Sequence, residues 1–179
     1  MVSPKWVTNF QIQKNMRLLL VILMATTLSN CSVSLSGISI DPNIKTFNVE
    51  RLEDVSELPE PTLAINLTEA LKDRIRNSSR LQWSNKEPDI IFTGVITNLR
   101  VSSEAPQAGA TSAINQLTIN VRIEYEDISN EDNNWKRTFS RFANFPGNQD
   151  FNSVKDELIE EISEFLIQDI FNEAFAKNW

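Results

Sequence analysis

Cys31 is the only cysteine of the chain and the residue with the most distinctive chemical surroundings. It follows an apolar run from Leu18 to Met24 and closes the tetrapeptide Leu28-Ser29-Asn30-Cys31. This arrangement is typical of a bacterial lipoprotein signal, in which the thiol is acylated and the peptide before it is removed. The sequence therefore predicts that residues 1–30 are a signal peptide and that lipid chains on Cys31 anchor the mature chain to a membrane.

The segment before the cysteine departs from the usual signal in one respect, because Asn30 stands where lipoprotein signals usually carry Gly, Ala or Ser. A short basic segment, Met16-Arg17, precedes the apolar run as a signal peptide requires, so Met16 is a plausible true start. The alternative is a transmembrane anchor with a bystander cysteine. Leu18–Met24 is far shorter than the roughly 20 apolar residues that span a bilayer, which favours the lipoprotein signal.

Several kinds of catalytic site are excluded by residue types that the chain lacks. There is no histidine, so a Ser-His-Asp triad, a Cys-His pair and a histidine-bound zinc are all impossible. The four glycines form neither a dinucleotide fingerprint nor a P-loop. We therefore expect that the protein is not an enzyme and that it binds neither a metal nor a cofactor. The surviving catalytic alternative is a glycosidase with two carboxylates, but most acidic residues fall on predicted solvent faces.

Charge narrows the choice of partners. Residues 1–30 contain three basic residues and no acidic ones, so the rest of the chain carries 14 basic and 24 acidic residues, a net charge of −10. Nucleic-acid binding needs a basic stripe and is disfavoured. The length of residues 31–179 suits a single domain with its own core.

Hydrophobic periodicity predicts five extended segments and two helices. We expect strands over Ser32–Ile40, Ile44–Leu52, Asp89–Ser103, Leu117–Glu126 and Trp135–Phe145, and helices that begin after the caps Thr62 and Ser153. Glu53–Pro61 and Asn130–Asn134 are expected to be connections, and Gly94 and Asn98 to mark a bulge. The order predicts an α+β fold with two helices on one face of a mostly antiparallel or mixed sheet of four to five strands, the other face being polar.

The chain resembles the LptE-type lipopolysaccharide-assembly lipoproteins in the version found in Bacteroidetes. The similar stretches run in order along the mature chain, and together they are fairly specific. They are Ser34-Leu35-Ser36-Gly37, Thr68–Arg74, Val101–Gly109, Asn115–Arg122, Phe139–Ala143, Asp156–Ile162 and Asn178-Trp179.

The resemblance implies an α+β fold and a role without catalysis. It implies a lipoprotein of the inner leaflet of the outer membrane, facing the periplasm. There it plugs the β-barrel translocon LptD, supports its assembly and assists delivery of lipopolysaccharide to the cell surface. Ser32 is compatible with outer-membrane sorting, because the aspartate associated with inner-membrane retention is absent.

Five basic residues on or beside adjacent predicted strands are candidate lipopolysaccharide contacts. They are Arg100, Arg122, Lys136, Arg137 and Arg141. Guanidinium groups bind phosphate groups such as those of lipid A through paired hydrogen bonds. The alternative is that these residues offset acids such as Glu124 and Glu126 on a solvated face, where exposed charges contribute little.

A loop with small residues is a second candidate, for contact with the barrel. It comprises Glu104, Ala105, Pro106, Gln107, Ala108, Gly109, Ala110, Thr111 and Ser112. Loops positioned by a rigid sheet often carry function, although a plain hairpin connection explains this loop equally well. The rival function is a lipid-anchored periplasmic binding or scaffold module for another envelope complex, such as a peptidoglycan or secretion component.

Overall fold

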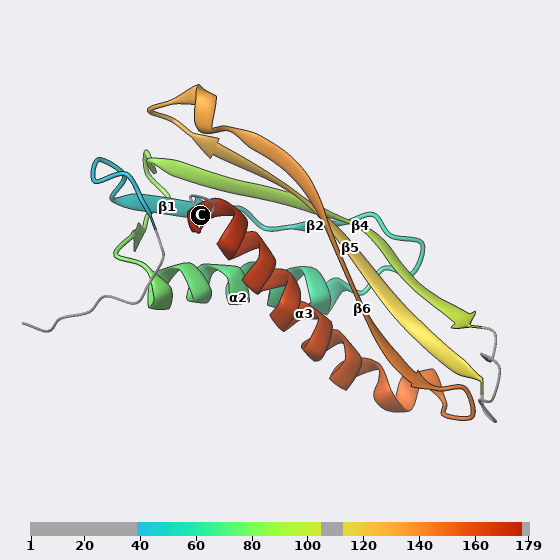
Figure 1. Cartoon of the computed structure of the whole chain (residues 1–179). Coiled ribbons are helices and arrows are strands. Elements are labelled where there is room, and N and C mark those ends of the chain that lie inside the picture. The colour runs from blue at the N-terminus through green and yellow to red at the C-terminus, as the bar shows by residue number, and fades with distance from the viewer. Residues whose placement is uncertain (1–38, 105–112, 177–179) are drawn as a thin grey trace, which may run out of the picture. The chain divides into compact units, whose positions relative to one another are not determined.

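A computed structural model describes residues 39–104 and 113–176 of the chain (Figure 1). The elements are β1 (Thr46–Val49), β2 (Glu53–Asp54), α2 (Pro61–Ser78), β3 (Gln82–Trp83), β4 (Ile90–Glu104), β5 (Ile114–Asp127), the 3-10 turn η1 (Glu131–Asn133), β6 (Trp135–Pro146) and α3 (Phe151–Phe175). The strand predicted over Ser32–Ile40 lies outside the described residues except for its last two, which belong to no strand.

The described strands form one mixed sheet of six strands in the order β3-β1-β4-β5-β6, with β2 also paired to β4. The pairs β1–β3, β1–β4 and β2–β4 are parallel, whereas β4–β5 and β5–β6 are antiparallel. The mixed α+β architecture is confirmed. The strand count exceeds the prediction because β2 and β3 have two residues each, too few to leave a periodic pattern.

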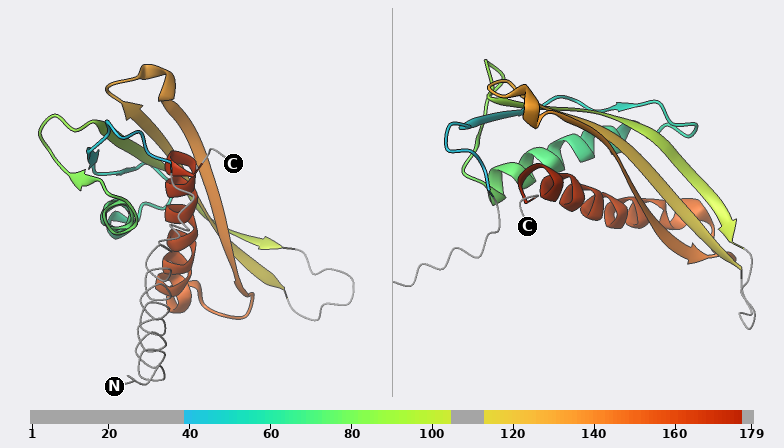
Figure 2. Two further views of the ribbon diagram at one scale, coloured as in Figure 1. Left: turned by 60° about the vertical axis from the view of Figure 1, so that its left-hand side comes forward. Right: turned by 45° about the horizontal axis from the view of Figure 1, so that its top comes forward.

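Both helices cover one face of the sheet, as predicted (Figure 2). α2 packs on β1, β2 and β3, and α3 packs along β5 and β6 and against α2. Between the layers lies a core of apolar side chains that includes Phe47, Phe92, Leu67, Ile119 and Ile162. Burying such a side chain contributes roughly 1.5–3 kcal/mol, so this layer is the main source of stability.

The strict alternation of β5 separates a helix face from an open face. Leu117, Ile119, Val121, Ile123 and Tyr125 are buried under the helices, and the residues between them are half-buried or exposed. β4 keeps the same division despite an irregularity, because its register with β5 shifts between Ile96 and Asn98. The predicted bulge is confirmed at Asn98, where it returns Leu99 and Val101 to the helix face, but Gly94 is not part of it and pairs in regular register with Ile123.

The starts of both helices differ from the prediction. Thr62 is not the cap of α2: the helix begins at Pro61, whose fixed φ suits the first helical position, and Glu60 precedes it without a side-chain cap. Ser153 is not the cap of α3, because the Asp150 carboxylate accepts a hydrogen bond of 2.9 Å from the Asn152 amide. The ring of Phe151, the first residue of the helix, packs near the ring of Phe145 of β6, with the centroids 5.9 Å apart.

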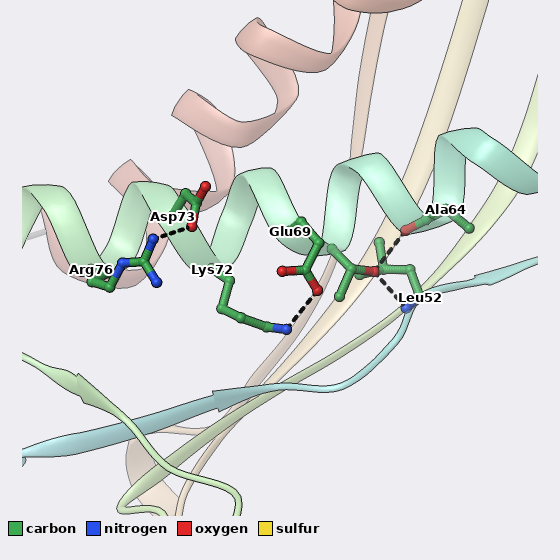
Figure 3. A network of polar contacts seen from close by, with 7 residues as sticks. Leu52, Ala64, Glu69, Lys72, Asp73 and Arg76 are labelled. Atoms are coloured by element: carbon green, nitrogen blue, oxygen red, sulfur yellow. Dashed lines mark hydrogen bonds and ion pairs between the residues drawn. The ribbon is translucent and has the colours of Figure 1, made fainter.

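Polar contacts occur on two sides of α2 (Figure 3). On the exposed side, Lys72 pairs with Glu69 and Arg76 with Asp73, each at 2.7 Å across one helical turn. On the buried side, the Thr68 hydroxyl donates to the Ala64 carbonyl at 2.7 Å and accepts from the Leu52 amide at 3.0 Å. The second bond satisfies a backbone donor of the β1–β2 connection inside the core.

The turn after β5 is organised by one buried carboxylate. Asp127 is 2% exposed and accepts hydrogen bonds from Ser129 (2.6 Å from the hydroxyl), the Asn130 amide (3.1 Å) and the Asn133 side chain (2.8 Å). Burial by itself raises the pKa of Asp127, but these hydrogen bonds outweigh it and hold the pKa below its ordinary value. The predicted connection over residues 130–134 is confirmed and contains η1.

Candidate functional site

The open face of β4, β5 and β6 is the surface on which three of the five predicted basic residues lie. Arg122 of β5 is flanked by Val95 and Thr138. Arg100 of β4 pairs with Thr118, which in turn pairs with Phe142 of β6. Both arginines are exposed, and Figure 1 shows that no helix covers this side of the three long strands.

Arg100 and Arg122 differ from the third basic residue of this face in their pairing. Lys136 of β6 forms an ion pair with Glu124, the residue directly across from it on β5. Among the described residues, neither Arg100 nor Arg122 forms an ion pair or a side-chain hydrogen bond. Their guanidinium donors are therefore available to an external anion.

The other two predicted residues, Arg137 and Arg141, lie on the opposite side of β6. Both pair with carboxylates of α3: Arg137 with Glu173, and Arg141 with Asp169 through two contacts of 2.6 and 2.7 Å. The hydrogen bonds that Arg141 donates to the Asp169 carboxylate raise the pKa of Arg141, and the Arg141 guanidinium also lies over the ring of Phe165. These two residues fasten α3 to the edge of the sheet, so the structure does not bring the five basic residues into one cluster.

The neighbours of Arg100 and Arg122 supply further polar groups and one apolar group. Ser140 donates to Asn120 at 2.7 Å, and Gln116 donates to Asn144 at 3.1 Å. Amide and hydroxyl groups therefore occupy the open face between the two arginines and on the far side of Arg100. Phe142 is 58% exposed beside them. Guanidinium groups, amides and an exposed ring suit an amphiphile that carries phosphate groups.

A groove between α2 and α3 was not anticipated from the sequence. It has a volume of about 910 Å³, with Leu63 and Ile167 among its apolar lining residues and with Asp73, Glu160 and Glu164 among its charged ones. Near its end, Lys155 of α3 pairs with Glu60 at 2.6 Å. The excess of carboxylates makes this groove unsuitable for a phosphate-bearing ligand, which leaves the open face as the better anion site.

Two predicted features lie outside the described residues. Cys31 is one of them, and the stretch Ala105–Ser112 of the candidate barrel loop is the other. The described residues on the two sides of that loop are close together, since Glu104 of β4 pairs with Ile114 of β5. The lipid anchor at Cys31 and the contact of the loop with the barrel therefore stay predictions.

Metal and membrane-spanning features were searched over the same described ranges. Within residues 39–104 and 113–176 there is no group of three or more acidic, cysteine or histidine side chains placed to hold a metal ion. Neither α2 nor α3 is apolar enough over a sufficient length to cross a bilayer.

Comparisons with solved structures find proteins that resemble this chain. A minor lipoprotein from Acinetobacter baumannii matches with a TM-score of 0.50 and 17% identity, over 73% of this chain and 92% of that one. A protein from Xanthomonas campestris matches with a TM-score of 0.50 and 12% identity, over 75% and 87%. Rare lipoprotein B from Shewanella oneidensis gives a TM-score of 0.43 and 14% identity, over 70% and 89%. The first two similarities show a shared fold alone.

Sequence comparisons identify the family. No curated protein sequence matches the chain. The model of the family described as LptE, lipopolysaccharide-assembly, matches residues 44–174, which include all the described strands and nearly all of α3. The match covers well over half of the chain, so the chain belongs to the LptE lipopolysaccharide-assembly family.

Proposed function

We propose that this protein is an outer-membrane lipoprotein that assists delivery of lipopolysaccharide to the cell surface together with an LptD-type β-barrel. The observation that carries the proposal is the family match over residues 44–174. The signal pattern that ends at Cys31 supports a lipid anchor in the inner leaflet, with the folded domain facing the periplasm. In this role the protein plugs the barrel and supports its assembly, and it catalyses no reaction.

The open face is the proposed contact for lipopolysaccharide. Arg100 and Arg122 are exposed and have no anionic partner within the described residues, so a lipid A phosphate replaces water around them without breaking an existing ion pair. Lys136 is a weaker contact because Glu124 already neutralises it. Arg137 and Arg141 serve the fold, because each of them joins β6 to an acidic residue of α3.

A gentle detergent extraction of the native membrane with a tagged chain tests the barrel partnership. We expect a large outer-membrane β-barrel to be recovered in a stoichiometric amount. A Cys31→Ser variant controls for the anchor, and it should leave the membrane fraction unless the barrel retains it. Recovery of the chain alone, or with a soluble periplasmic protein, would contradict the proposal and favour the scaffold function.

A further inference from the structure

One edge of β4 is left without a neighbouring strand over its second half. β1 lies beside Ile90–Phe92, and β2 lies beside Val95 and Ile96. Beyond Ile96, no described residue pairs with this edge, which runs from Thr97 to Ser103 and is called the free edge here. In Figure 1, β4 continues past β2 toward the far end of the sheet with β5 on one side only.

The register shows which backbone groups point out of the sheet at the free edge. The carbonyls of Phe92 and Ile96 accept hydrogen bonds from the flanking chain, at 2.9 Å from Glu50 and 3.1 Å from Val55. Residues that face the helices therefore direct their backbone groups to this edge, while the residues between them bond to β5. β5 continues in register after the bulge.

The same alternation then applies to the second half of β4. Arg100 pairs with Thr118 and Ser102 with Gln116. Thr118 and Gln116 lie on the same face of β5 as Arg122, which pairs with Val95 before the bulge. The N–H and C=O groups of Leu99, Val101 and Ser103 consequently point to the free edge. An unpaired row of this kind is a template for an added strand.

The free edge of β4 and the outer edge of β6 differ in the features that discourage strand addition. β6 carries Lys136, Arg137 and Arg141, two of which are tied to α3. The free edge has the sequence Thr97-Asn98-Leu99-Arg100-Val101-Ser102-Ser103, with one charge, no lysine and no proline. Proteins commonly protect exposed edges with charges or proline, so an edge that lacks them suits a partner strand.

We propose that the free edge of β4 accepts an extended segment of the barrel partner as an added strand. This inference rests on the proposed function, because that function supplies the partner. Backbone pairing requires a polypeptide, which excludes a glycolipid as the occupant of this edge.

One observation and one prediction from the sequence favour the barrel partner over a second copy of this chain. A fully overlapping antiparallel pairing of two copies of Thr97–Ser103 would place Arg100 directly opposite Arg100, and like charges in that position are destabilising. The free edge is also continuous in sequence with the stretch Glu104–Ser112, which was predicted to contact the barrel.

A proline at the free edge tests strand addition without preventing the protein from folding. Val101→Pro removes an N–H that points outward, and proline is tolerated on strand edges, so the variant should fold. We expect its recovery of the barrel from native membranes to fall by about tenfold, since an edge hydrogen bond is lost and the added strand is displaced. Val101→Thr is the matched control and should recover the barrel normally.

Amide hydrogen exchange on the unmodified protein tests the proposal without relying on a variant. In the free protein, Leu99, Val101 and Ser103 should exchange faster than Arg100 and Ser102, whose amides bond to β5. In the complex with the barrel, the three faster amides should slow by at least about tenfold, as expected for new hydrogen bonds.

Each other outcome overturns the inference in a distinguishable way. A complex that forms with unchanged exchange at the free edge would overturn strand addition and leave the proposed function standing. Absence of any barrel complex would overturn both. A Val101→Pro variant that folds and recovers the barrel as well as Val101→Thr does would also overturn strand addition.

Discussion

The open face and the helix face of the same three strands use arginine in opposite ways. Arg122 projects from the open face and meets no carboxylate among the described residues, whereas Arg141 lies on the helix side and is held by Asp169 at 2.6 and 2.7 Å. The two residues are on neighbouring strands of one sheet. The comparison teaches that the phase of the strand decides whether a cation is free for a ligand or is used by the fold.

The largest expected contrast concerns one phenylalanine on each face. Phe92 is 1% exposed under the helices, and Phe142 is 58% exposed on the open face. Phe92→Ala should lower the free energy of unfolding by about 3–5 kcal/mol, because it removes buried area and leaves a cavity. Phe142→Ala should change it by less than about 1 kcal/mol. Urea denaturation of both variants measures the difference, and equal losses would contradict the assignment of the faces.

The next contrast concerns two neighbouring acidic residues at the end of β5. Asp127 is buried and hydrogen-bonded by the following turn, and Glu126 is exposed on the open face. Asp127→Ala should cost about 2–3 kcal/mol of unfolding free energy, because it leaves several donors without their acceptor. Glu126→Ala should stay within about 0.5 kcal/mol. Thermal melts of the two variants test this, and an Asp127→Ala protein as stable as the parent would refute it.

The lowered pKa of Asp127 predicts part of the loss of stability at acid pH. The pKa of Asp127 is lower in the folded chain than its ordinary value of 3.8, so its stabilising effect is complete above that value. The effect is lost as the pH falls through the lower folded pKa, where the carboxylate takes up a proton. Asp127→Ala should therefore flatten the decline of stability below about pH 4. Unfolding curves measured across that range for both proteins decide the point.

A close contact at Gly94 gives a contrast of intermediate size. A Cβ at this position would lie 2.6 Å from the Ile123 Cδ1 atom and 3.1 Å from the Arg122 carbonyl oxygen. Gly94→Ala should cost about 1–3 kcal/mol through overpacking on the helix face. The neighbouring change Thr93→Ala, on the open face, should cost less than about 1 kcal/mol. If chemical denaturation shows that Gly94→Ala leaves the free energy of unfolding unchanged, the close packing described at Gly94 would be contradicted.

The smallest expected effect on stability concerns the arginines themselves. The Arg141–Asp169 pair is partly exposed, so a double-mutant cycle with Arg141→Gln and Asp169→Asn should give a coupling of about 0.5–1 kcal/mol. Arg122→Gln should leave stability unchanged within about 0.5 kcal/mol. A coupling near zero would mean that Arg141 is as free as Arg122, which would remove the comparison.

Much of the layer arrangement was predictable from the sequence, because the alternation in β5 separates buried from exposed residues along its whole length. The same reasoning applied to β6 contained a signal that was missed. Arg137 and Arg141 share the phase of Phe139 and Phe145, which are buried. That phase already indicates the helix side, although their partners on α3 follow only from the packing of the helix.

Other features could not be predicted because they depend on tertiary contacts. Strands of two residues, such as β3, carry no periodicity, and their pairing is decided by neighbouring chain segments. The free edge of β4 follows from the strand order, which the sequence of one strand does not contain.

Lipopolysaccharide binding by matched pairs of variants tests the central claim most directly. The purified domain would be titrated with lipopolysaccharide as the unchanged chain, as Arg100→Gln with Arg122→Gln, and as Arg137→Gln with Arg141→Gln. We expect the open-face pair to weaken binding by about tenfold or more, as the loss of two charge-assisted contacts implies, with stability unchanged. The helix-side pair should keep its affinity and lose stability instead. Equal affinity of the unchanged chain and the open-face pair, or a larger loss from the helix-side pair, would contradict the account.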